Sequence, residues 1–336
     1  MNKTKIKVLL IGGAVADIIA AGLPKVADPG QSAQPSEGIQ LHVGGHPTNI
    51  SRDLVKLGLP PPNIYLAAAI GHDVFGQFIE AELRKFKINL NLQKIGRIDT
   101  SKNVILVVKG EKRRNHFAPG ASHYLDLEAV SDLLREVKPS LFYAGALGGH
   151  LNEKIDVVLH EAQQLGCLTF LDTPLPSRKK ARDILTYTDI LHLNDLEASQ
   201  YTGTNDVTAA SDLFMQQGVQ MAFITFGEGG ALVRTRRLGL RQQAFNVSMI
   251  DPTGPGDAFC SGILYSLYTR LEKERGINLK ELSLTELREM MLFGQAVGAV
   301  CVTGVGTTTA ISFDAVSKLI DEQAEDVRNS TRSLLQ

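Results

Sequence analysis

The chain has 336 residues, of which 43% are hydrophobic and 21% are charged, and its formal net charge is −1. The near-zero charge excludes a global field that would attract nucleic acid or an anionic membrane, and no run of about 18 apolar residues is present to span a bilayer. At roughly 100–200 residues per domain, the length predicts one large domain or two smaller ones with substantial cores.

The chain begins with a basic N-terminus and an apolar run, MNKTKIKVLLIGGAVADIIAAG. A secretory signal peptide has a similar outline, but glycines and Asp17 interrupt the run, and a carboxylate is costly in a signal core. We therefore predict a buried strand here. Cys167, Cys260 and Cys301 lie in apolar surroundings without metal-site spacing, which indicates buried reduced thiols and a cytoplasmic protein.

Short runs rich in Val, Ile and Leu alternate with helical patterns along most of the chain. The runs are typical of buried strands and lie at 7–13, 64–71, 140–147, 168–173, 189–195 and 221–233. Helices are predicted at 49–58, 74–86, 127–137, 154–166, 195–203 and 208–218, and longer ones at 257–274, 284–304 and 312–330. This alternation predicts an α/β fold, with a doubly wound, mostly parallel sheet and helices on both faces.

Two segments, 14–43 and 92–118, break the alternation because they contain turns and strand-like runs without a helix between them. The sequence KGEK at 109–112 marks a hairpin turn in the second segment. We expect both segments to form a small antiparallel β-sheet, inserted into the α/β body as a lid. Residues 1–325 then form one domain that includes the lid, and the polar tail at 326–336 is expected to fray.

The stretch DPTGPGDAF at 251–259 reads as a turn between a strand and a helix that begins near Pro255 or Gly256. The free N–H groups and positive dipole of a helix N-terminus bind anions, and glycine lets a phosphate approach the backbone closely. In one interpretation Asp257 is only a first-turn acid and Asp251 a turn former. In the other, the turn is an anion hole beside a general base, the pairing that phosphoryl transfer needs. A Walker A sequence and a G-x-G-x-x-G fingerprint are absent.

Six segments in family order resemble the ribokinase-like (PfkB) carbohydrate kinases. The last one is similar to the family's C-terminal signature D-T-x-G-A-G-D-x-F, and the first to its G-G-x-x-x-N-x-A opening helix. The segments are GGHPTNISRDLVKLG (44–58), AAIGHDVFGQFI (68–79), FAPGAS (117–122), LNDLEASQYTG (193–203), ITFGEGGALV (224–233) and DPTGPGDAFCSGIL (251–264). The likeness extends from about residue 6 to 312, so the expected fold is ribokinase-like.

The resemblance implies an ATP- and Mg²⁺-dependent kinase that acts on a hydroxyl of a sugar. Asp257 would be the general base, and Gly254 and Gly256 would form the anion-hole turn. The residues that would bind sugar hydroxyls are Asp17, Gly44, Gly45 and Asn49. Taken alone, Asn49 also fits a helix-surface amide and the glycine pair a plain turn.

The resemblance also implies a nucleotide side. Asn194 and Glu197 would lie near the phosphates, with Glu197 on Mg²⁺ through water, although the same pair fits an ordinary helix cap. Thr225, Gly227 and Gly230 would shape the nucleotide site. Some family members bind a monovalent cation, and a K⁺ site here would involve Asp251, Thr253, Gly304 and Gly306.

Several positions depart from the family pattern. Pro255 replaces the usual alanine, while Val15 and His46 replace an asparagine and a lysine of ribokinases, which argues against ribokinase proper. His46 fits either a substrate contact or a surface or cap histidine. The elements around Asp17 and 44–49 carry no Lys or Arg for a sugar phosphate, but Arg113 and Arg114 in the lid are available.

The acceptor has alternatives. A nucleoside kinase of the same family shares these motifs but needs an aromatic base pocket, for which the lid region offers Phe75, Phe117 and Tyr124 and no Trp. A phosphofructokinase-like enzyme is a weaker alternative, and a catalytically silent sugar-binding regulator is disfavoured by the intact Asp257. Because lids of this kind pair between subunits in the family, a homodimer through the lid is expected.

Overall fold

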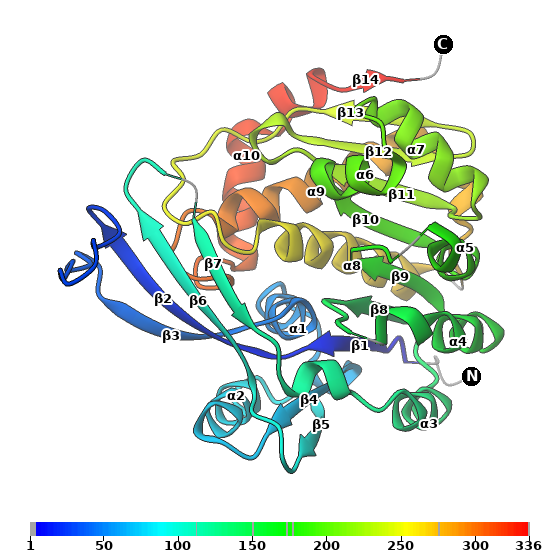
Figure 1. Cartoon of the computed structure of the whole chain (residues 1–336). Helices are drawn as coiled ribbons and strands as arrows, with labels where there is room; N and C mark the ends of the chain where they lie inside the picture. The colour runs from blue at the N-terminus through cyan, green and yellow to red at the C-terminus, as the bar shows by residue number, and fades with distance from the viewer. Residues whose placement is uncertain are drawn as a thin grey trace.

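The computed structural model describes residues 5–111, 113–149, 151–172, 174–176, 178–274 and 276–334. These residues form a ten-stranded sheet, flanked by helices, and a separate four-stranded sheet that projects from one end (Figure 1). The order in the large sheet is β14-β13-β12-β11-β10-β9-β8-β1-β4-β5. The seven strands from β11 to β5 are parallel, and β12, β13 and β14 add antiparallel pairs at one edge.

The strands of the large sheet are β1 (Val8–Gly13), β4 (Ile64–Gly71), β5 (Asn89–Ile95), β8 (Leu141–Gly145), β9 (Leu168–Asp172), β10 (Ile190–Asn194), β11 (Met221–Thr225), β12 (Ala231–Thr235), β13 (Gly239–Gln242) and β14 (Arg332–Ser333). Those of the small sheet are β2 (Val15–Leu23), β3 (Ile39–Gly44), β6 (Ser101–Val108) and β7 (Arg114–Ala118). The helices are α1 (His46–Lys56), α2 (Val74–Arg84), α3 (Leu127–Val137), α4 (Leu151–Gln164), α5 (Arg178–Thr186), α6 (Asp195–Thr202), α7 (Val207–Gln216), α8 (Pro255–Lys273), α9 (Leu284–Cys301) and α10 (Phe313–Asn329). None of the helices in the described ranges is both long and apolar enough to cross a lipid bilayer.

Each face of the large sheet has its own hydrophobic core. Successive side chains of β1 alternate between them, because strand side chains point to opposite faces. Val8 and Leu10 pack with residues of α1, α2, α8 and α9, whereas Leu9 and Ile11 pack with residues of α3 to α7. The doubly wound α/β fold predicted from the strand–helix alternation is thus confirmed.

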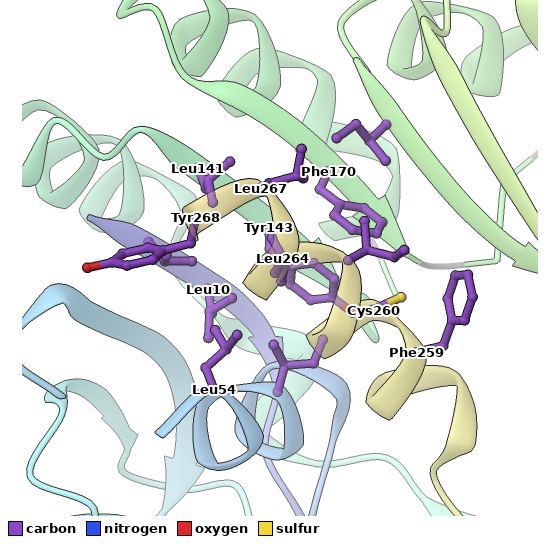
Figure 2. Close-up of a cluster of buried hydrophobic side chains, with 14 of the residues drawn as sticks. Leu10, Leu54, Leu141, Tyr143, Phe170, Phe259, Cys260, Leu264, Leu267 and Tyr268 are labelled. Carbon is purple, nitrogen blue, oxygen red and sulfur yellow. The ribbon is translucent and has the colours of Figure 1, made fainter. Parts of the chain in front are cut away.

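Helix α8 packs across the middle of the first core. Figure 2 shows its side chains Cys260, Leu264 and Leu267 beside Tyr143 of β8 and Phe170 of β9. All five side chains are almost completely buried. The start of α8 is therefore fixed relative to the carboxyl ends of the central strands.

The small sheet differs from the prediction in two respects. Its outer pairs, β2–β3 and β6–β7, are antiparallel, but its central pair, β2–β6, is parallel. Since β1 and β5 both run parallel to β4, the chain leaves the large sheet at the same edge both times, and the two excursions pair in the same direction. The second excursion begins at Ser101, because residues 92–95 belong to β5 of the large sheet.

Some smaller expectations also need correction. Within the tail predicted at 326–336, α10 continues to Asn329, β14 pairs with β13, and Val327 is buried. Helix α5 was missed, and no strand precedes the turn at 251–254. Lys112 of the predicted turn, Thr173 of a predicted strand and residues 335–336 of the tail lie outside the described residues.

The contact between α8 and α9 generates a stability prediction. A Cβ on Gly262 would lie 2.7 Å from the Cα of Gly294, and this backbone atom moves only if the helices separate. Gly262→Ala is therefore expected to lower the free energy of unfolding by about 1–3 kcal/mol, although alanine normally favours a helix by about 1 kcal/mol. Urea unfolding followed by circular dichroism measures this, with Ser266→Ala on the same helix as a control expected within about 0.5 kcal/mol. A Gly262→Ala protein as stable as wild type would contradict this close contact.

Candidate active site

A cavity of about 950 Å³ opens at the carboxyl ends of the central strands, between the large sheet, the small sheet and the start of α8. Ligands of open α/β sheets bind at this edge, near the point where the strand order reverses, here between β1 and β8. Twelve of the residues expected at the site line the cavity: Asp17, Gly45, Asn49, Asn194, Glu197, Thr225, Gly227, Gly230, Thr253, Gly254, Gly256 and Asp257. Gly44, Asp251, Gly304 and Gly306 are not part of its lining.

The turn before α8 has the geometry of an anion-binding helix start. Gly254 is the N-cap residue in a left-handed conformation (φ +83°), and Pro255 occupies the first helical position, where its missing N–H is no loss to the helix. The amides of Gly256 and Asp257 then belong to the first turn, where N–H groups have no intrahelical partner. This turn can therefore offer donors and positive dipole to an anion.

The Asp257 carboxylate is buried in that first turn. Its Oδ2 accepts a hydrogen bond from Asn49 Nδ2 at 2.7 Å, and its Oδ1 lies 3.7 Å from His46 Nδ1. Asn49 is itself oriented, because its Oδ1 accepts from Arg52 Nη2 at 2.6 Å and from Thr307 Oγ1 at 2.8 Å. Burial raises the pKa of Asp257, and His46 opposes this most strongly.

Asp172, Tyr143 and His192 also belong to the site, although sequence reasoning did not identify them. The Asp172 carboxylate ends β9 and accepts from the Tyr143 hydroxyl and from His192 Nδ1 at 2.9 Å. Burial raises the pKa of Asp172, but His192 and His46 outweigh it and hold that pKa well below its usual range. The available signal was a polar residue at the carboxyl end of a buried parallel strand.

His46 links the two carboxylates. Its Nδ1 lies 3.4 Å from Asp172 Oδ2 as well as 3.7 Å from Asp257 Oδ1. Burial disfavours the charged ring, but Asp257 and Asp172 outweigh it and raise the pKa of His46 to about 10. His46 is thus a cation between two carboxylates at neutral pH, and not a plain surface or cap histidine.

Asp17 lies on the wall formed by the small sheet. Burial raises its pKa to about 7, against the lowering effects of a hydrogen bond from Asn103 and the charge of Arg113. Gly44 lies behind this carboxylate, since a Cβ at that position would be 1.9 Å from Asp17 Oδ2. Gly44 therefore makes room for Asp17 and does not itself line the cavity.

The opposite end of the cavity contains the residues expected on the nucleotide side. Asn194 and Glu197 cap α6 reciprocally, with 2.8 Å from Glu197 N to Asn194 Oδ1 and 3.0 Å from Asn194 N to Glu197 Oε2. This pair therefore caps α6 and also lines the cavity. Thr225 Oγ1 lies 3.2 Å from His192 Nε2, so this end connects to the Asp172 network.

Asp251 organises the loops behind the anion-hole turn. Its Oδ1 accepts from the backbone N–H and hydroxyl of Thr253, and its Oδ2 accepts from Gly306 N at 2.8 Å. The Thr253 carbonyl accepts from Cys301 Sγ at 3.4 Å. Asp251 thus ties the turn at 251–254 to the loop after α9.

The raised pKa of Asp17 predicts a pH-dependent cost in stability. The folded state favours protonated Asp17, so ionisation opposes folding; the cost is absent below about pH 4, grows up to about pH 7 and is constant above it. At pH 8, Asp17→Asn should therefore have a free energy of unfolding about 1–3 kcal/mol higher than wild type in urea titrations. At pH 4 the two proteins should differ little. A variant less stable than wild type at pH 8 would show that the carboxylate stabilises the fold.

Known proteins resemble this chain in sequence and in fold. Residues 5–313 match the model of the pfkB family carbohydrate kinases. A probable fructokinase-7 of Arabidopsis thaliana is 26% identical over 313 residues, which are 86% of this chain and 84% of that protein. A ribokinase from Giardia lamblia superposes with a TM-score of 0.83 at 19% identity, over 95% of this chain and 99% of that one. A putative ribokinase II from E. coli, in complex with ATP and Mg²⁺, superposes with a TM-score of 0.76 at 18% identity, over 94% of this chain and 99% of that one. These structures confirm the ribokinase-like fold, and the family match shows that the chain belongs to the pfkB carbohydrate kinases and is a phosphotransferase.

Proposed function

We propose that this chain transfers the γ-phosphoryl group of ATP to a hydroxyl of a sugar, with Asp257 as the general base. The observation that carries the proposal is the buried Asp257 carboxylate in the first turn of α8, fixed by Asn49 and lining the large cavity. A base in this position lies beside the donors that would bind the transferred phosphoryl group.

Asp257 would take the proton of the attacking hydroxyl on Oδ1, since Oδ2 is occupied by Asn49. Burial raises the pKa of Asp257, which strengthens it as a base, while the charge of His46 favours the ionised form that accepts the proton. The amides of Gly256 and Asp257, with the Gly254 turn, would stabilise the phosphoryl group; Pro255 contributes no donor.

The acceptor wall favours a sugar over a nucleoside. Asp17, Asn49 and Gly45 line it with groups that bind hydroxyls. Of the three lid-region aromatic residues that could bind a nucleobase, Phe117 lines the cavity, whereas Phe75 and Tyr124 do not. The similarity to a fructokinase supports a sugar as well, and the intact base argues against a silent regulator.

The nucleotide would occupy the end with Asn194, Thr225, Gly227 and Gly230. Mg²⁺ prefers oxygen ligands and keeps several waters. Glu197 fits this chemistry, because it lines the cavity and its capping contact uses only Oε2, so we propose that it holds the ion through water. When bound, the ion would neutralise phosphate charge. K⁺ would bind behind the turn, where Asp251 orders the loops that carry Thr253, Gly304 and Gly306.

The small sheet would act as a lid that excludes water from the transfer. On one face, Ile39, Leu41 and Val104 are 69%, 40% and 39% exposed. Leu41 and Val104 both pair with Ile18, so this face is continuous across three strands. A homodimer through this face would cover it, and three buried free cysteines suit a cytoplasmic protein.

Replacement of Asp257 by asparagine tests the proposed base. Turnover should fall by roughly 10²–10⁴ because the hydroxyl proton has no acceptor, while ATP and sugar still bind. A coupled assay of ADP release measures turnover, and calorimetry measures binding. Asp195→Asn, another acid in the first turn of a helix but exposed and outside the cavity lining, is the matched control and should retain turnover. Unchanged turnover in Asp257→Asn would refute the mechanism.

A further inference from the structure

Arg113 has a buried guanidinium nitrogen, Nη1, that lacks a hydrogen-bond partner among the described residues. The residue directly precedes β7 in the small sheet and belongs to the cavity lining. By contrast, Arg52 uses its guanidinium on Thr48 O, Val43 O and Asn49 Oδ1, and the neighbouring Arg114 pairs with Glu111.

Asn103 is a second unsatisfied group on the same wall. Its Oδ1 is buried without a partner, and the residue also lines the cavity, directly opposite Asp17 in the β2–β6 register. A buried polar group without a partner destabilises the fold, so such groups are retained where something else completes them. Two of them on one cavity wall indicate that a polar ligand group binds there.

Arg113 acts on the Asp17 end of the cavity. Its charge lowers the pKa of Asp17, and the residue lies on the cavity face of the small sheet, four residues before Phe117, which pairs with Asn103 opposite Asp17. No ion pair within 4.0 Å joins Arg113 to Asp17 or to another described carboxylate. The guanidinium thus belongs to the wall that carries Asp17, and its Nη1 can bind a ligand.

We infer that Arg113 binds an anionic group, a carboxylate or a phosphate, on the part of the acceptor remote from the transferred hydroxyl. A planar guanidinium fork matches either anion, and charge-assisted hydrogen bonds of this kind are stronger than neutral ones. The preferred acceptor is therefore an acidic sugar. This inference rests on the proposed sugar kinase function and specifies its substrate class.

The test compares matched neutral and anionic acceptors in the ADP-release assay. Fructose with fructose 6-phosphate probes a phosphate, and glucose with gluconate probes a carboxylate. Wild type should show the higher kcat/KM for the anionic member of at least one pair, and the responding pair identifies the anion. Arg113→Gln should reduce that preference by about 10- to 100-fold, mainly through KM for the acceptor. Arg113→Lys, which keeps the charge but not the fork, should lose less.

Arg114→Gln is the control, because it removes a neighbouring charge that is already paired with Glu111, and it should leave the preference unchanged. Wild type that prefers the neutral member of both pairs, or an Arg113→Gln enzyme with an unchanged preference, would overturn the inference and leave the sugar kinase intact. A rise in KM for ATP instead of the acceptor would assign Arg113 to the nucleotide and also overturn it. Absence of phosphorylation of all four compounds would count against both proposals.

Discussion

The hydrogen bond from Asn49 on α1 to Asp257 on α8 is the contact on which the site depends. Both helices pack on the same face of the large sheet, where Ile50 and Leu54 of α1 and Cys260 and Leu264 of α8 belong to one buried core. The carboxylate is therefore positioned by the interior of the domain, and its burial is tolerable because Asn49 satisfies one oxygen and His46 supplies charge. The same burial that makes the group costly to fold makes it a stronger base.

Electrostatic balance imposes the second constraint. Asp257 and Asp172 would raise each other's pKa if they stood alone, and His46 between them, with His192 on the far side of Asp172, compensates. Through His192 and Thr225 this network extends along the ends of β9, β10 and β11, and so joins the acceptor and nucleotide ends of one cavity. Such a connected polar network favours a single arrangement of its hydrogen-bonded members.

The alternation of strand-like runs with helical patterns was enough to predict the two-faced sheet, because continuously apolar strands such as β1 must be covered on both faces. The resemblance to the pfkB family pointed to Asp257 and Asn49, which lie near the starts of α8 and α1, and the structure brings them into contact. Local pattern could not assign β5 to the large sheet, since β5 and β6 are both short strands and only their neighbours differ. Sequence reasoning also missed Asp172 and His192, because the pairing of parallel strands brings them beside Asp257, and they are not close to it in sequence.

The central claim is that the free oxygen of a core-anchored Asp257 receives the acceptor proton. A crystal structure with a non-hydrolysable ATP analogue and an acceptor sugar that the enzyme phosphorylates tests it most directly. The account predicts an acceptor hydroxyl about 2.6–3.2 Å from Asp257 Oδ1, within reach of the proton it must lose, with the Asn49 bond to Oδ2 intact and the terminal phosphate at the Gly254–Gly256 turn. An acceptor hydroxyl directed at the phosphate but bonded to another side chain, with Asp257 out of reach, would contradict it.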